Sequence, residues 1–100
     1  METVPVHVFA RWKVKEGCMP EVLQLLKLLR EQTLAEKGNL FYRIHKSNTD
    51  ADILILFEGY SSALAQQAHV NSDHFKKLAT GGIVPHLSER EVFLTTPLED

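Results

Sequence analysis

Residues 4–14 read VPVHVFARWKV, and this stretch decides the fold. Its side chains alternate in character from one residue to the next. One face carries Val4, Val6, Val8, Ala10, Trp12 and Val14, and the other carries Pro5, His7, Phe9, Arg11 and Lys13. Because side chains two residues apart share a face of an extended strand, this alternation predicts a β-strand from Val4 to Val14, closed by Glu16-Gly17.

A helical pattern follows this strand. Pro20 suits the first helical position, where its missing N–H group costs nothing. Apolar residues then recur at helical spacing; they are Met19, Val22, Leu25, Leu26 and Leu29. We expect the helix to run to about Lys37, with Gly38 as its C-terminal cap.

Four further segments complete the chain. Ile53–Tyr60 is apolar on both faces, which predicts a central strand covered on both sides. The others are a strand over Asn39–Lys46, a helix from Ser61 or Ser62 to about Val70, a short helix from Asp73 to Thr80 that ends at Gly81-Gly82, and a strand over Glu89–Thr95. The order strand, helix, strand, strand, helix, strand predicts an α+β, ferredoxin-like βαββαβ domain with a four-stranded antiparallel sheet. The 100 residues suit one domain, spanning 1–100.

The two helices can cover only one face of such a sheet. The opposite face is expected to carry His7, Phe9 and Arg11, with Glu91 and Phe93 from the last strand. The second strand adds either Phe41, Arg43 and His45 or the set Leu40, Tyr42 and Ile44. A face this apolar predicts an interface between two copies of the chain, and therefore a homodimer. A pocket is expected between sheet and helices in each subunit.

Composition excludes several classes of partner. The formal net charge is −2 with both signs interspersed, and no basic stripe suggests nucleic acid. The single cysteine, Cys18, allows no internal disulfide and suits a reducing compartment. No apolar run approaches the roughly 20 residues that a membrane span needs, and the N-terminus does not read as a signal peptide. We therefore expect a cytoplasmic protein with no membrane partner.

Two stretches carry a family motif. They are Phe57-Glu58-Gly59-Tyr60 with Ala63-Leu64, and Ala68-His69-Val70-Asn71-Ser72-Asp73-His74-Phe75. Together with Lys15-Glu16-Gly17 and the segment 36–42, EKGNLFY, they resemble the antibiotic biosynthesis monooxygenase family. That resemblance implies a dimeric α+β barrel. It covers nearly the whole chain, although Tyr60 stands where Trp is usual and Leu56 where the ring-oxidising members carry Asn.

The resemblance also implies an activity. It suggests a small monooxygenase that needs no cofactor and uses dioxygen on a quinol- or anthrone-like aromatic. His69 is then the candidate general base, because the pKa of an imidazole lies near neutrality, with Glu58 or Tyr60 orienting it. The structural alternatives are a His69 ring that holds the break between two helices, and a Glu58 that forms an ion pair within the dimer, with Arg43 or Arg90.

Further residues are candidates for contact with the substrate. They are His7, Phe9, Leu56, His74 and Phe75. Simple dimer packing explains His7 and Phe9 equally well, and a capping or surface role is the alternative for His74. On one continuous helix His69 and His74 would be rotated by about 140° from each other. They would then share no face, so no metal site is expected.

Two other functions remain open. One is a non-oxidative enzyme that processes a small carbonyl signal molecule, with histidines as acid and base. The other is a stress-response dimer that binds a small ligand without turnover. Oxygen uptake separates the first of these from a monooxygenase, and ligand-induced thermal stabilisation without product identifies the second.

Overall fold

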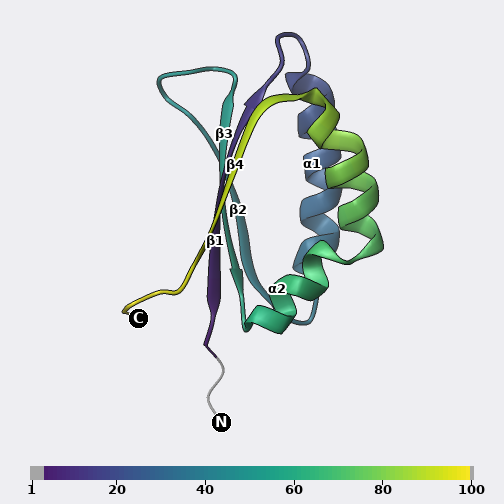
Figure 1. The fold of residues 1–100 in the computed structure, drawn as a ribbon. Coiled ribbons are helices and arrows are strands. Elements are labelled where there is room, and N and C mark those ends of the chain that lie inside the picture. Colours follow the sequence, from purple (N-terminus) through teal and green to yellow (C-terminus); the bar gives the residue numbers. More distant parts are fainter. Residues whose placement is uncertain (1–3, 100) are drawn as a thin grey trace.

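The computed structural model describes residues 4–99 as one antiparallel sheet with every helix on the same side (Figure 1). The strands are β1 (Val6–Val14), β2 (Asn39–Lys46), β3 (Ile53–Tyr60) and β4 (Leu87–Thr95). The helices are α1 (Met19–Leu34), α2 (Ala63–Val70), the π-helix η1 (Phe75–Ile83) and the short 3-10 helix η2 (Val84–His86). The strand order is β2-β3-β1-β4. This confirms the predicted ferredoxin-like βαββαβ fold and the central position of β3.

The inner face of the sheet, toward the helices, is the hydrophobic core. Val8, Ala10, Trp12 and Val14 of β1 point into it and are each at most 4% exposed. Leu26 and Leu29 of α1 and Ile83 of η1 pack against them from the helical layer. The alternation that predicts the first strand therefore also predicts which of its faces is buried, because successive side chains point to opposite sides. Among residues 4–99, no helix is long and apolar enough to cross a membrane.

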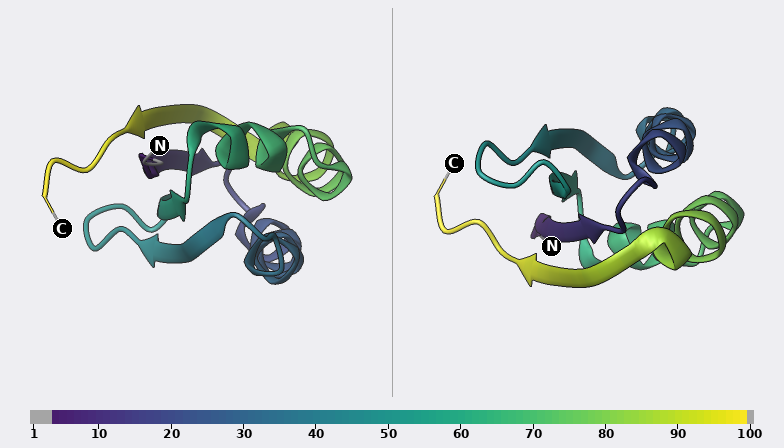
Figure 2. Two further views of the ribbon diagram at one scale, coloured as in Figure 1. Left: turned by 90° about the horizontal axis from the view of Figure 1, so that it is seen from below. Right: turned by 90° about the horizontal axis from the view of Figure 1, so that it is seen from above.

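The outer face of the sheet points away from the helices, which lie on the opposite side of the sheet in both views of Figure 2. At its centre Phe9 pairs with Phe57 on β3 and with Phe93 on β4. The rings of Phe9 and Phe57 stack at 4.6 Å between centroids. Of the two sets left open for β2, Phe41, Arg43 and His45 lie on this face, whereas Tyr42 is 2% exposed on the inner face.

The first helix ends earlier than predicted. The N–H group of Glu36 donates to the carbonyl of Thr33 at 3.0 Å, which closes α1 with a tight turn after Leu34 instead of continuing it to Lys37. Gly38 is not a left-handed cap, because Gly17 is the glycine with positive φ among the described residues. A side chain at position 38 would instead overlap Ala65 of α2. The correction matters for function, since it places Glu36 in a turn beside α2.

The helix before β4 runs on where it was predicted to stop. It passes through Gly81-Gly82 as a π-helix, and the N–H group of Val84 donates to the carbonyl of Ala79, five residues back. A Cβ atom on Gly82 would lie 3.1 Å from Leu25 Cδ1. Glycine is therefore used there to let η1 approach α1 closely, not to end the helix.

Two strand limits also differ from prediction. The strand β1 begins at Val6 and not at Val4, and β4 begins at Leu87 and not at Glu89. The limits of β2 and β3 agree with those predicted. Strand ends are set by pairing with a neighbour as well as by local pattern, and in the β1–β4 ladder the pairing runs from His7–Thr95 to Val14–Leu87.

Candidate active site

His69 is a buried histidine in the last turn of α2. The helix starts where predicted, because the hydroxyl of Ser62 accepts from the N–H group of Ala65 at 3.1 Å. Eight helical residues then carry His69 to a position over the sheet, where it is 3% exposed. Its ring lies between those of Tyr60 and Phe75, with centroids 5.1 and 5.0 Å away.

The side chain of Ser72 bridges the break after α2. The Ser72 hydroxyl donates to the backbone carbonyl of His69 at 2.6 Å and accepts from the N–H group of Phe75 at 3.2 Å. These bonds end one helix and begin the next. The ring nitrogens of His69 are therefore available for other partners.

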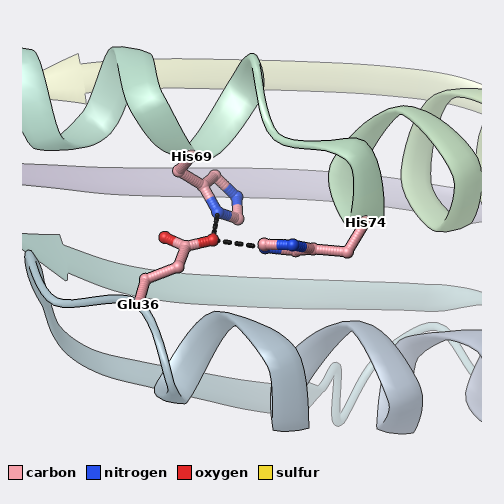
Figure 3. Close-up of side chains that lie close together, drawn as sticks. All are labelled: Glu36, His69 and His74. Carbon is pink, nitrogen blue, oxygen red and sulfur yellow. Dashed lines mark hydrogen bonds and ion pairs between the residues drawn. The ribbon is translucent and has the colours of Figure 1, made fainter.

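Glu36 brings the two histidines together (Figure 3). Its Oε2 atom lies 2.8 Å from His69 Nδ1 and 2.5 Å from His74 Nε2. The prediction that His69 and His74 share no face is wrong, because it holds for one continuous helix and the chain bends between them. Imidazole nitrogens and a carboxylate are metal-ligand types, and the three donor atoms lie within 4.8 Å of one another. Glu36, His69 and His74 are thus the described residues that could hold a metal ion.

The second ring nitrogen of His69 faces another carboxyl group. Its Nε2 atom lies 3.8 Å from Glu58 Oε1, and that same oxygen accepts from the Tyr60 hydroxyl at 2.6 Å. The two candidates for orienting His69 are therefore assembled beside it. Within residues 4–99 of the single chain Glu58 forms no ion pair with Arg43 or Arg90, and Arg43 lies on the outer face. The alternative of an ion pair within a dimer stays a prediction.

Burial sets the protonation of this group. It raises the pKa of Glu58 to about 7, an effect that the hydrogen bond from Tyr60 opposes and the charge of Glu36 assists. Burial lowers the pKa of His69, against the opposing influence of Glu36. It also raises the pKa of Tyr60, so this hydroxyl keeps its proton. Near neutral pH the site then combines a neutral imidazole with a carboxyl group close to half-protonated.

A cavity of about 50 Å³ opens beside this group, between the sheet and α2. Its lining comprises Val8, Ala10, Trp12, Tyr42, Glu58, Gln66, His69, Val70, Phe75, Arg90 and Val92. Tyr42 shares the buried carboxyl environment, since burial and the charges of Glu58 and Glu36 raise its pKa. The lining is mainly apolar, with its ionisable groups at a few defined positions, as is usual for a small-molecule site.

The predicted site residues divide into four groups. His69, Glu58 and Phe75 line the cavity, whereas Tyr60 and Leu56 are fully buried behind it. His74 contacts Glu36 outside the lining. His7 and Phe9 lie on the outer face, as strand alternation predicts, and do not line this cavity, so their contact with a substrate stays a prediction.

Sequence reasoning missed four residues that the structure brings to the site. They are Trp12, Glu36, Tyr42 and Arg90. Glu36 and Tyr42 stand in the quoted EKGNLFY segment, and Trp12 is on the helix-facing side of the first strand. Their positions are visible in the sequence, but only the tertiary fold brings these three residues close to His69.

Comparison with known proteins identifies the family of this chain. Residues 5–80 match the antibiotic biosynthesis monooxygenase family. The chain belongs to this family. A relative named "Putative monooxygenase Rv0793", from Mycobacterium tuberculosis, is 34% identical over 73 residues, which are 73% of this chain and 71% of the relative.

Solved structures of relatives share the fold along almost their whole length. The structure of Rv0793 from Mycobacterium tuberculosis superposes with a TM-score of 0.89 at 28% identity, covering 96% of this chain and 97% of the other. A conserved protein from Methanosarcina mazei Go1 superposes with a TM-score of 0.87 at 28% identity, covering 93% of this chain and 92% of the other.

The raised pKa of Glu58 predicts a pH-dependent stability. The folded protein keeps this proton up to about pH 7, whereas the unfolded chain releases it near its ordinary pKa of 4.5. The contribution of the Glu58 proton to the free energy of unfolding is therefore fully present below pH 4.5 and is lost as the pH rises to 7. Glu58→Gln cannot titrate, so its free energy of unfolding relative to the parent should rise over this interval by on the order of 3 kcal/mol.

Urea unfolding of both proteins at a series of pH values measures this difference. Using the difference cancels the titration of His69 and of surface groups, which both proteins share. A difference that stays constant from pH 4.5 to 8 would show that Glu58 ionises normally in the folded protein.

Proposed function

We propose that this protein is a cofactor-independent monooxygenase that oxidises a small quinol-like aromatic with dioxygen and uses His69 as general base. One observation carries the proposal, namely a buried imidazole held at one nitrogen in the wall of an apolar cavity. Because the Glu36 carboxylate only accepts hydrogen bonds, His69 Nδ1 carries the hydrogen and Nε2 keeps a lone pair. Membership of the family and the name of the Rv0793 relative support monooxygenase chemistry in general.

The reaction needs little beyond proton transfer and a dry site. His69 Nε2 takes the phenolic proton of the quinol, and the electron-rich anion forms a carbon–oxygen bond with dioxygen. The resulting hydroperoxide loses water and leaves a carbonyl group. The quinol supplies all the electrons, so that quinol and dioxygen give a hydroxyquinone and water. Positioned proton transfer of this kind accelerates reactions by roughly 10²–10⁴-fold.

The other site residues support this chemistry. Glu36 stabilises the imidazolium that forms when His69 accepts the proton, since the two are 2.8 Å apart. Glu58, with its pKa near 7, donates a proton to a developing oxyanion or hydroperoxide when it is protonated. The apolar walls exclude water, which strengthens both interactions.

The size of the cavity favours a single-ring substrate. About 50 Å³ is room for a few water molecules. A monocyclic quinol needs less enlargement of this space than a three-ring anthrone does. We therefore place monocyclic quinols first among the substrates to be tested.

Oxygen uptake with a panel of quinols tests the proposal. We expect consumption of dioxygen in equal amount to the product, with one atom of ¹⁸O from ¹⁸O₂ in the hydroxyquinone. No uptake with any member would contradict it. Isomerisation of a hydroxyketone without oxygen uptake would favour a carbonyl-processing enzyme, and thermal stabilisation without product would favour a binding dimer.

The outer face of the sheet supports a homodimer as part of the same proposal. Phe9 and Phe93 are 40% and 53% exposed there, beside a stack of aromatic rings. Apolar side chains grouped in this way on one face are typical of an interface. Packing the outer faces of two copies against each other would bury them around a two-fold axis.

Phe9→Glu is expected to convert the dimer to a monomer. The substitution places a carboxylate at the centre of the apolar face, where pairing would require its desolvation. Sedimentation velocity measures the change in mass. Leu64→Glu is the control, because Leu64 is 76% exposed on α2 and away from this face. A Phe9→Glu variant that stays dimeric, like the Leu64→Glu variant, would place the interface elsewhere, and a monomeric parent protein would contradict the homodimer.

A further inference from the structure

Trp12 presents a buried polar atom that the proposed mechanism leaves without a role. The side chain is 4% exposed and lines the cavity. Its Nε1 atom is buried and has no hydrogen-bond partner among the described residues. Buried N–H groups in folded proteins are almost always satisfied, so an unsatisfied one in a cavity wall points to an acceptor that arrives with a ligand.

Arg90 lies beside this indole. It pairs directly with Trp12 across the β1–β4 ladder, so the two side chains leave the same face of the sheet as neighbours. Arg90 also lines the cavity. The other three arginines have partners, since Arg11 binds Glu89 and Glu91, Arg30 binds the carbonyl of Tyr42, and Arg43 lies over the Phe41 ring. For Arg90 no such partner is found within residues 4–99.

The cavity therefore has two chemically different ends. Glu58 pairs with Val8 of β1, whereas Arg90 pairs with Trp12, four residues further along the same strand. Four residues of strand span about 13 Å. The end of the cavity with the Trp12 and Arg90 donors is therefore well separated from the carboxyl group of Glu58. Between the two ends the wall is apolar, formed by Ala10, Phe75 and Val92.

We infer that the substrate is an aromatic acid, whose carboxylate binds the Trp12 Nε1–H group and the Arg90 guanidinium while its ring lies toward His69. Both groups are donors without an acceptor, and a carboxylate offers two oxygens to receive them. The apolar wall between the ends fits a single ring. The inference names a substrate class for the proposed monooxygenase. Oxidation of the aromatic acid rests on that proposed function, whereas binding of its carboxylate does not.

Anaerobic calorimetry with a matched pair of ligands tests it, using 2,5-dihydroxybenzoate and 1,4-dihydroxybenzene. The two differ only in the carboxylate. We expect the acid to bind the native protein about tenfold more tightly or better, because one charge-assisted hydrogen bond is worth at least about that factor. In Arg90→Gln the preference should fall to within about threefold, and in Arg43→Gln, an arginine on the outer face, it should persist.

Trp12→Phe provides a second variant, since it removes the N–H group and keeps an aromatic ring. It should weaken binding of the acid more than binding of the neutral quinol. Three results would overturn the inference. They are equal affinity of the native protein for both ligands, no binding of either ligand, and a preference for the acid that is unchanged in Arg90→Gln. The calorimetry is anaerobic, so it measures binding of the acid without its oxidation. If the acid binds as expected but is not oxidised when air is admitted, the proposed monooxygenase activity is contradicted and the carboxylate site is not.

Discussion

His69→Ala is expected to lower oxygen uptake by roughly 10²–10⁴-fold, the range for loss of a positioned general base. The imidazole is the one group in the cavity lining that is neutral near pH 7, has a free lone pair and is held by a carboxylate. Glu58 is the competing base in this lining because its pKa is near 7, but its Oε1 atom already accepts from Tyr60 and about half of the group is protonated at pH 7. Initial rates in an oxygen electrode measure the effect.

His86→Ala is the matched control for this experiment. His86 also contacts a carboxylate, with Nε2 3.1 Å from Glu21 Oε2, but that glutamate is 67% exposed and the pair lies outside the cavity. It should retain near-native rates. His69→Gln complements the alanine variant, because its amide can still donate to Glu36 while lacking a basic nitrogen. Near-native uptake by a folded His69→Gln protein would exclude His69 as the base.

Leu26→Ala is expected to cost about 2–5 kcal/mol of unfolding free energy. Leu26 is 1% exposed and packs within the core between α1 and the sheet. Truncation removes buried apolar surface and leaves a cavity that the rigid sheet cannot collapse to fill. Urea unfolding at fixed protein concentration measures the loss, since an associating protein gains stability with concentration.

Leu28→Ala removes the same atoms from the same helix two residues away. Leu28 is 48% exposed, so its loss should change stability by no more than about 0.5 kcal/mol. Comparable losses at the two positions would mean that α1 does not present Leu26 to the core as described. The pair therefore tests the helical periodicity by which α1 was predicted.

Periodicity accounts for what could be predicted of the fold. Alternation along β1 and helical spacing along α1 are local patterns, and each matches the face that the structure buries. The limits of β2 and β3 follow from turn residues next to apolar runs. The ends of α1 and η1 were wrong, because a tight turn at Glu36 and a close approach between Gly82 and Leu25 depend on neighbours from other elements.

The candidate site was only partly predictable for the same reason. His69, Glu58 and Tyr60 were found from the family motif, and the structure brings them together. Glu36 is 33 residues from His69 in the chain, and only the packing of the α1–β2 turn against α2 brings their side chains into contact. His7 and Phe9 show the converse, because strand alternation alone predicts the face on which they lie.

The alternation over residues 4–14 determined by itself that β1 has one buried and one outer face, since the pleat imposes that choice on any strand. The sequence likewise determined the order of elements and hence the ferredoxin-like fold. Only the tertiary structure decided that Trp12 meets Arg90 and that Glu36 holds both His69 and His74. Contacts between distant segments depend on register and on the direction in which each turn sends the chain, and no local pattern of side chains specifies either.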